Sequence, residues 1–204
     1  MPQPVSVIAD DVARKARSAD GYLQRMERLY ATSALNQTDL LRAYSGAFLS
    51  FHAFAESALE RIFFGVLMGR LSCSDGSVRP LVHINSEVIA RKVVFGTRRY
   101  IDWVPYNNLT IPRATAFLSR GKPFSDIAST DRNHFDNMAV LRNALAHQSS
   151  YADTRFTRVF TAGRPLPPNQ LRPDGYLRGH HAAGQTRANY LLAETVRIFR
   201  VLCH

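Results

Sequence analysis

Apolar residues recur at steps of three and four along most of the chain, which is the spacing of one face of an α-helix. The longest such stretch carries an apolar stripe formed by Phe48, Phe51, Ala55, Leu59, Ile62 and Val66. The pattern predicts helices over about residues 10–35, 39–70, 86–103, 113–119, 129–148 and 187–203. Strand-like alternation nowhere extends beyond a few residues. We therefore expect an all-α bundle, formed as a single domain over residues 1–204.

Two segments lie outside this helical pattern. Residues 1–9 are expected to form a flexible N-terminus. Residues 161–186 contain four prolines and four glycines and show no helical period. A connector of this length is unusual inside a compact domain. We interpret it as a long Pro/Gly-containing loop before the C-terminal helix, ordered for a functional or interface role.

Several polar and aromatic residues carry local structural predictions. Thr38 or Asp39 is the expected N-cap of the second helix, and Ser86 that of the third. Trp103 and Tyr106 are interpreted as core anchors rather than as platforms for stacked bases. Two polar residues early in the fifth helix are interpreted as capping or surface groups: His134 and Asp136.

The basic residues far outnumber the acidic ones. Lys and Arg together number 26 against 16 Asp and Glu, for a net charge of +10, and all but Lys15, Lys92 and Lys122 are arginines. Arginine is the better side chain for planar, two-pronged phosphate contacts. The charge favours an anionic partner, most simply a nucleic acid. An arginine-rich composition inherited from GC-rich DNA is the alternative interpretation.

The chain lacks the patterns of membrane, secreted and metal-binding proteins. Its longest apolar run, "IFFGVLM" at residues 62–68, is too short for a bilayer, and no signal peptide precedes it. Cys73 and Cys203 have no metal-type spacing, and no third ligand is spaced to join the adjacent His180 and His181. We expect a reduced cytoplasmic protein with no membrane partner, metal or cofactor.

The segment "AVLRNALAHQSS", residues 139–150, holds the candidate chemistry. On a helix, Arg142 and His147 lie about 140° apart, with Ala139, Asn143 and Ala146 between them. Imidazole transfers protons near neutral pH, and a guanidinium stabilises a phosphate that gains charge. The small alanines would let another helix approach closely. The alternative is an arginine on the helix flank and a histidine placed where the macrodipole favours cations.

A second candidate group lies on the long second helix. His52, Glu56 and Glu60 follow at four-residue steps, so they share one face. They form either a solvated polar row or a group that faces the site.

A third candidate group, Arg172, Tyr176 and Arg178, lies in "RPDGYLRG". These residues are expected to contact RNA through phosphate pairing and base stacking. The alternative is a loop that packs on its own bundle.

Four segments together resemble one known family. "RNALAH" resembles the R-x(4–6)-H signature of HEPN domains, in which a polar residue commonly follows the arginine. "LSFHAFAESALERIFF" resembles the acid-bearing second helix of the RiboL-PSP-HEPN-like subgroup. The segments "YIDWVPYNNLTIPRATAFLSRGKPFSDI" and "LPPNQLRPDGYLRG" resemble those that flank the motif. The resemblance covers about residues 10–203.

This resemblance implies an all-α HEPN bundle that forms a homodimer. Arg142, Asn143 and His147 occupy the motif positions, and Glu56 is the acidic residue that would hold the arginine. Catalytic members are metal-independent endoribonucleases whose Arg and His residues from both subunits meet at the interface. Their products carry a 2′,3′-cyclic phosphate and a 5′-OH. Many relatives are toxins or antiphage effectors, so the expected partners are RNA, a second copy, and an antitoxin or another defence-system protein.

The sequence leaves two other classes of function open. Some HEPN domains have lost catalysis and bind RNA, a nucleotide or a partner protein, and the long segment 161–186 would suit a partner surface. A structural subunit of a larger complex is the third reading.

Overall fold

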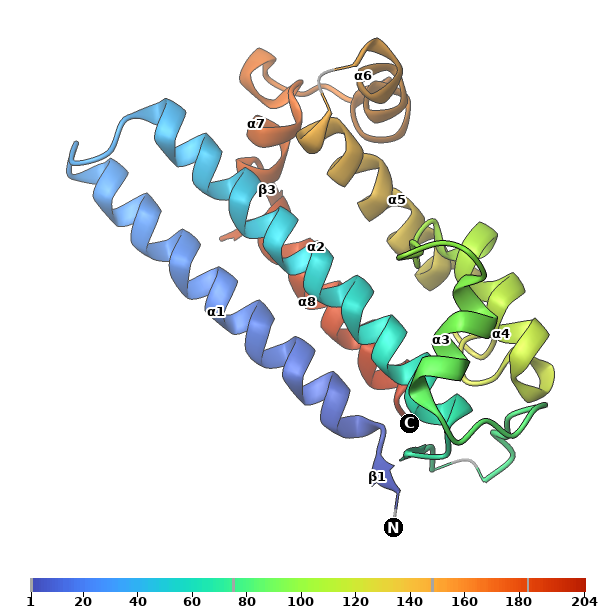
Figure 1. The fold of residues 1–204 in the computed structure, drawn as a ribbon. Helices are drawn as coiled ribbons and strands as arrows, with labels where there is room; N and C mark the ends of the chain where they lie inside the picture. Colours follow the sequence, from blue (N-terminus) through green and yellow to red (C-terminus); the bar gives the residue numbers. More distant parts are fainter. Residues whose placement is uncertain (1, 75, 148, 183) are drawn as a thin grey trace. The chain divides into compact units, whose positions relative to one another are not determined.

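The computed structural model describes residues 2–74, 76–147, 149–182 and 184–204 (Figure 1). Helices make up 68% of the structure and strands 6%, which confirms the predicted all-α class. The α-helices are α1 Ser6–Ala31, α2 Gln37–Leu67, α3 Glu87–Phe95, α4 Ile111–Phe117, α5 Ser129–Ala146, α6 Ser150–Phe156, α7 Pro173–Arg178 and α8 Arg187–Leu202. Shorter π and 3-10 turns cover Tyr106–Thr110, Ser119–Gly121, Thr157–Thr161 and Pro168–Gln170.

Two short strand pairs accompany the helices. β1 (Gln3–Pro4) pairs in parallel with β2 (Leu71–Ser72), in the register Gln3 to Leu71. β3 (His180–Ala182) pairs antiparallel with β4 (Gln185–Thr186).

The chain divides into two compact units. Unit 1 comprises residues 2–12, Ala55–Asp136 and Thr195–His204. Unit 2 comprises Ala13–Phe54 and Asn137–Glu194. Helices α1, α2, α5 and α8 each contribute residues to both units.

Aromatic side chains form the core of unit 1. The Phe63 ring of α2 lies 5.0 Å from the Trp103 ring and 6.2 Å from that of Phe124, between centroids. Tyr106 stacks on Phe135 at 5.1 Å. Trp103 and Tyr106 are both buried, so their prediction as core anchors is confirmed. Close packing of these rings contributes much of the free energy of folding of this unit.

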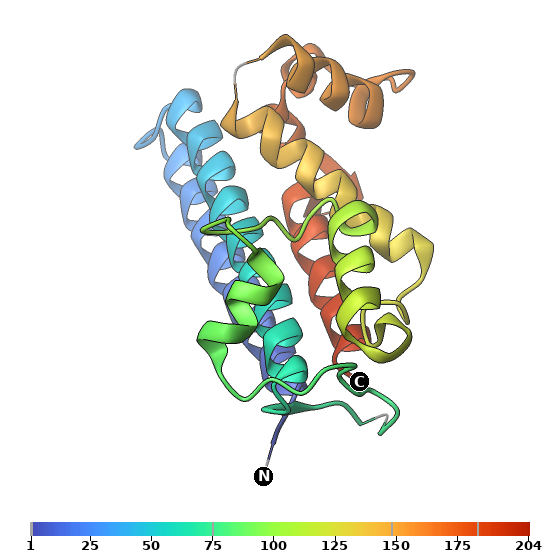
Figure 2. The same cartoon turned by 45° about the vertical axis from the view of Figure 1, so that its right-hand side comes forward.

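The core of unit 2 has two parts. Within this unit, α1 and α2 lie side by side in both views (Figures 1 and 2) and bury Leu23, Phe48 and Phe51 between apolar neighbours. Phe156 of α6 and Phe160 of the following turn lie 5.8 and 5.1 Å from the ring of Tyr176 in α7. These rings tie the segment after α5 to α7.

Some helix boundaries differ from the predicted ones. Helix α1 begins at Ser6 rather than near residue 10, because Val5 and Ile8 are buried. Helix α3 ends at Phe95 rather than near 103, because Gly96 adopts a positive φ of 63° and its N–H caps the helix at Lys92. The predicted cap Ser86 is confirmed, since its side chain accepts from the N–H of Ile89.

Further differences concern α2, α5, the Pro/Gly-rich segment and α6, a helix that the sequence pattern did not predict. The cap of α2 is Asn36, whose Oδ1 accepts from the N–H of Asp39 at 2.9 Å, so the prediction of Thr38 or Asp39 was wrong. The predicted end of the motif helix at Gln148 lies outside the described residues. Segment 161–186, predicted as irregular, contains α7 and the β3–β4 pair.

Candidate functional site

Arg142, Asn143 and His147 meet at the C-terminal end of α5. His147 is the first residue after the helix, and its N–H donates to the carbonyl of Asn143 at 2.9 Å, which extends the helical pattern by one bond. Arg142 Nη1 donates to Asn143 Oδ1 at 2.8 Å and lies 3.5 Å from His147 Nε2. Arg142 is half-buried and His147 is exposed. One copy of the chain therefore brings a guanidinium and an imidazole nitrogen together.

The side chains of Arg142 and His147 lie closer together than a helical wheel suggests. An angular separation of about 140° places the two Cα atoms on different faces of a helix. The long side chain of Arg142 bridges that separation, and Asn143 holds its guanidinium on the side of His147. Asn143 is thus a positioning residue for Arg142.

The alanines of the motif differ in their surroundings. Ala146 is exposed, whereas Ala139 is buried within the chain. The chain itself therefore covers Ala139, whereas Ala146 stays exposed. A helical pattern shows which residues share a face, but it does not show whether the chain itself already covers that face.

His52 on α2 belongs to the polar group for which the sequence left open whether it is solvated or faces the site. It is 3% exposed, and its ring centroid lies 6.1 Å from that of Phe48 on α2. Burial, together with the positive charge of Arg142, lowers the pKa of His52 to about 4. The sequence feature that indicates its burial is its position one helical turn after Phe48, next to the apolar stripe of α2.

The low pKa of His52 predicts a pH-dependent stability. Between about pH 6.5 and pH 4 the unfolded chain protonates this histidine and the folded chain does not. The free energy of unfolding should therefore fall as the pH drops through that window, by roughly 3 kcal/mol in total from this group. Urea denaturation of wild type and His52→Gln at several pH values measures the difference, in which the titration of carboxylates common to both proteins cancels.

The exposed His83 supplies the control, because His83→Gln leaves His52 in place and should keep the wild-type pH dependence. The same pH dependence in wild type and His52→Gln would contradict the assigned burial of a neutral His52.

Glu56 and Glu60 belong to unit 1 and hold Trp103. Glu56 Oε1 accepts from the backbone N–H groups of Trp103 and Val104 at 3.0 and 3.2 Å. Glu60 Oε2 accepts from Trp103 Nε1 at 3.0 Å, and its other oxygen pairs with Arg91. The two carboxylates thus bind named donors rather than forming a solvated row. The predicted role of Glu56 in holding Arg142 stays a prediction.

Early polar residues of α5 serve the packing of unit 1. Asp136 accepts from the backbone N–H of Tyr106 and from the side chain of Asn107, which caps the π-turn that starts at Tyr106. His134 Nε2 lies 2.9 Å from Thr195 Oγ1. Both residues therefore bind partners elsewhere in unit 1 rather than capping α5.

A cavity of about 220 Å³ adjoins the exposed side of His147. Its walls are Val140, Asn143, His147, Ser149, Tyr151, Ala152 and Arg155. Ser149 caps α6, since its Oγ accepts from the N–H of Ala152 at 3.2 Å. The sequence patterns indicated no functional role for the α6 residues in this wall.

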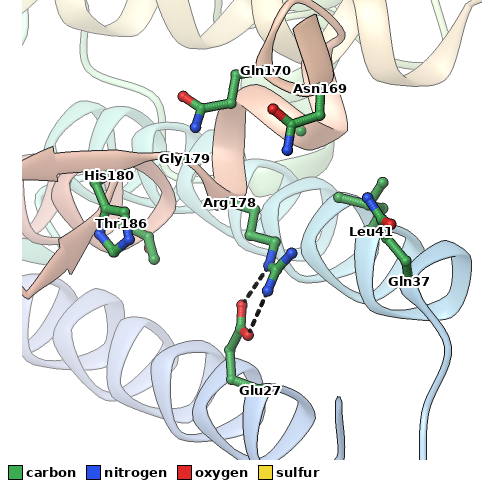
Figure 3. Close-up of a pocket in the computed structure, with 10 residues that line it drawn as sticks. Glu27, Gln37, Leu41, Asn169, Gln170, Arg178, Gly179, His180 and Thr186 are labelled. Atoms are coloured by element: carbon green, nitrogen blue, oxygen red, sulfur yellow. Dashed lines mark hydrogen bonds and ion pairs between the residues drawn. The ribbon is translucent and has the colours of Figure 1, made fainter. Parts of the chain in front are cut away.

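The predicted RNA-contacting residues lie in three different environments. Arg178 donates from Nε and Nη2 to the two carboxylate oxygens of Glu27 at 2.9 and 3.1 Å (Figure 3), and Tyr44 also donates to Glu27. Tyr176 is only 6% exposed and packs its ring against Arg187. The side chain of Arg172 is 82% exposed.

Of these three residues, Arg172 has the most exposed side chain, and its Nε lies 3.9 Å from Oδ1 of Asp174. It lines a depression of about 740 Å³ with Arg42, Asp153 and Asp174. Arg178 lines a different cavity, of about 370 Å³, together with Glu27, Gln37, Asn169, Gln170, His180 and Thr186 (Figure 3). Tyr176 and Arg178 both contact other residues of unit 2, and their contact with RNA stays a prediction.

Neither a group of metal ligands nor a membrane-spanning helix occurs in the described part of the chain. Within it, no three or more His, Cys, Asp and Glu side chains are grouped to hold a metal ion. No helix there is both long enough and apolar enough to cross a membrane. The ring of His181 stacks on Tyr190 at 3.8 Å.

Comparisons with known proteins add no relative: no family model matches the chain, and no curated protein or solved structure matches it either. A HEPN assignment therefore depends on the quoted sequence segments and on the site geometry.

Proposed function

We propose that the protein is a metal-independent endoribonuclease of the HEPN type. The observation that carries this proposal is the convergence of Arg142 Nη1 on His147 Nε2, 3.5 Å apart, with Asn143 holding the guanidinium. The order of the HEPN-like segments along the chain and the net charge of +10 support it further.

The proposed reaction is a transesterification within RNA. The 2′-oxygen of one ribose attacks the adjacent phosphorus, the bond to the 5′-oxygen of the next nucleotide breaks, and a 2′,3′-cyclic phosphate remains. One group must take the proton of the 2′-OH, and another must donate a proton to the leaving 5′-oxygen. His147 performs one of these transfers, while Arg142 stabilises the charge that accumulates on the phosphorane.

The proton balance gives a reason for a homodimer. A single imidazole does not act as base and acid in the same concerted step, so a second proton-transfer group is needed. A second copy of the chain supplies it when the ends of two α5 helices meet, which gives a composite site. The exposed positions of His147 and Ala146 are compatible with such a meeting.

The biological setting is proposed from the resemblance alone. A toxin or antiphage effector acting on cytoplasmic RNA fits it, held in check by an antitoxin or another defence-system protein. Arg172, with its exposed side chain, is the retained candidate for an RNA contact.

The direct test is RNA cleavage in the presence of EDTA. We expect purified wild type to cut an end-labelled RNA without added metal. The downstream fragment should accept phosphate from polynucleotide kinase without prior dephosphorylation, because its end is a 5′-OH. The upstream fragment should end in a 2′,3′-cyclic phosphate, and acid should open that ring to a phosphate monoester. A requirement for divalent metal, or products with 3′-OH ends, would overturn the proposal.

A second candidate is a non-catalytic HEPN module that binds RNA, a nucleotide or a partner protein. The net charge of +10 supports it equally, because positive charge attracts RNA or a nucleotide whether or not the site transfers protons. Under this alternative, wild type binds RNA without turnover, and binding survives replacement of Arg142 and of His147.

A further inference from the structure

We propose that the cavity beside His147 is a nucleotide subsite, in which Tyr151 stacks on a base and Arg155 binds the phosphate of that nucleotide. The cavity is lined by both residues and by His147 itself. The inference rests on the proposed function only in taking RNA as the ligand.

Arg155 carries a hydrogen-bond donor that the folded chain leaves without an acceptor. Its Nε is buried and has no hydrogen-bond partner among the described residues. No acidic side chain described in the structure forms an ion pair with it. A buried donor without an acceptor costs free energy, and a guanidinium offers five N–H donors in a fixed plane. An oxygen-rich anion such as a phosphodiester would satisfy them.

Tyr151 provides an aromatic face at the same cavity. It is 71% exposed, and it lies four residues before Arg155, so the two share one face of α6. The Cζ of Arg155 lies 5.9 Å from the centre of the Tyr151 ring. An exposed ring next to a cation is the arrangement that binds single-stranded nucleic acid by stacking and charge together.

The size and place of the cavity suit one nucleotide of a longer strand. Pockets that enclose a whole small molecule measure about 300–1,000 Å³, whereas this one measures about 220 Å³. Asn143 and His147 form its wall toward Arg142. A nucleotide bound there would place a neighbouring phosphate next to the proposed reacting groups.

The test measures binding of an oligonucleotide that cannot be cut. A fluorescent single-stranded 2′-O-methyl RNA lacks the free 2′-hydroxyl nucleophile, so its anisotropy reports affinity alone. A set of such strands, each with one abasic position, shows where a base contributes. We expect one abasic position to weaken binding to wild type by about 5- to 100-fold. Tyr151→Ala should weaken binding of the intact strand by a similar factor. This variant should bind the intact strand and that abasic strand with equal affinity. Tyr151→Phe should bind as wild type.

Arg155→Gln should weaken binding of every strand and reduce the salt dependence of log K by about 0.7, the value for one phosphate of a single strand. Matched controls exist for both residues. Tyr100 is 76% exposed but lies in unit 1, and Arg158 is an exposed arginine three residues after Arg155. Tyr100→Ala should bind as wild type. Arg158→Gln removes the same charge, so its effect measures the general electrostatic contribution.

The outcomes separate this inference from the proposed nuclease activity. If Tyr151→Ala and Arg155→Gln bind the strands as tightly as their controls, Tyr100→Ala and Arg158→Gln, the proposed subsite is overturned. This holds whether or not wild type cuts RNA. Wild type that binds but never cuts, with both variants impaired, would keep the subsite and overturn the nuclease. If wild type cuts unmodified RNA, Tyr151→Ala should raise KM and leave kcat nearly unchanged. Absence of any RNA binding by wild type would overturn both.

Discussion

Replacing His147 by alanine is expected to lower the rate of RNA cleavage by about 10²–10⁴-fold, the usual contribution of a positioned general acid or base. Arg142→Ala should lower it by about 10²–10³-fold, because the phosphorane then lacks its cation. Arg142→Lys should restore little of the lost rate, since an ammonium does not reproduce the planar contact that Arg142 makes with Asn143. The measurement is the initial rate of cleavage of an end-labelled RNA in EDTA.

Controls for this experiment use exposed residues of the same type. His83→Ala and Arg164→Ala remove an exposed histidine and an exposed arginine, and both variants should cut at the wild-type rate. Asn143→Ala should show a smaller loss than Arg142→Ala, because it frees the guanidinium without removing its charge. Wild-type cleavage by both His147→Ala and Arg142→Ala would show that the end of α5 is not the reacting site.

Loss of the Trp103 side chain should be the most damaging single change to stability. Trp103→Ala empties a buried volume beside Phe63 and removes the N–H that Glu60 accepts. We expect the free energy of unfolding to fall by about 3–5 kcal/mol. Trp103→Phe should cost less, because it keeps an aromatic ring in the core and loses mainly the hydrogen bond to Glu60. Denaturant unfolding followed by circular dichroism is the suitable measurement, since Trp103 is the only tryptophan of the chain.

Tyr100→Ala is the matched control for this prediction. Tyr100 is a large aromatic residue only three positions away, but it is largely exposed. Its replacement should change the free energy of unfolding by no more than about 0.5 kcal/mol. Equal stabilities of Trp103→Ala and Tyr100→Ala would contradict the packing assigned to unit 1.

The two predictions concern different parts of the chain and can fail separately. His147 and Arg142 belong to unit 2, whereas Trp103 and Glu60 belong to unit 1. A catalytic loss in a variant that keeps the wild-type unfolding curve therefore indicates chemistry rather than misfolding.

Sequence periodicity alone was sufficient for the helical class and for several individual residues. The stripe of α2, the cap at Ser86 and the burial of Trp103 and Tyr106 all follow from local patterns. Arg142, Asn143 and His147 are also neighbours in sequence, so their meeting needs little more than one turn of helix. Such features depend on residues a few positions apart, and the sequence specifies them directly.

Other features depend on which distant segments meet, and only the tertiary structure decided them. Arg178 forms an ion pair with Glu27 across about 150 positions of sequence within unit 2, and no local pattern indicates that pairing. His52 is buried near the charge of Arg142, and Ala139 is buried as well, although a helical wheel leaves the surroundings of both residues open. Periodicity shows that a helix has an apolar face but not what covers it, because burial and charge are set by long-range packing. The sequence by itself therefore determined the long helices α1, α2, α5 and α8 and the local Arg–Asn–His group. The three-dimensional fold decided the environment in which that group would act.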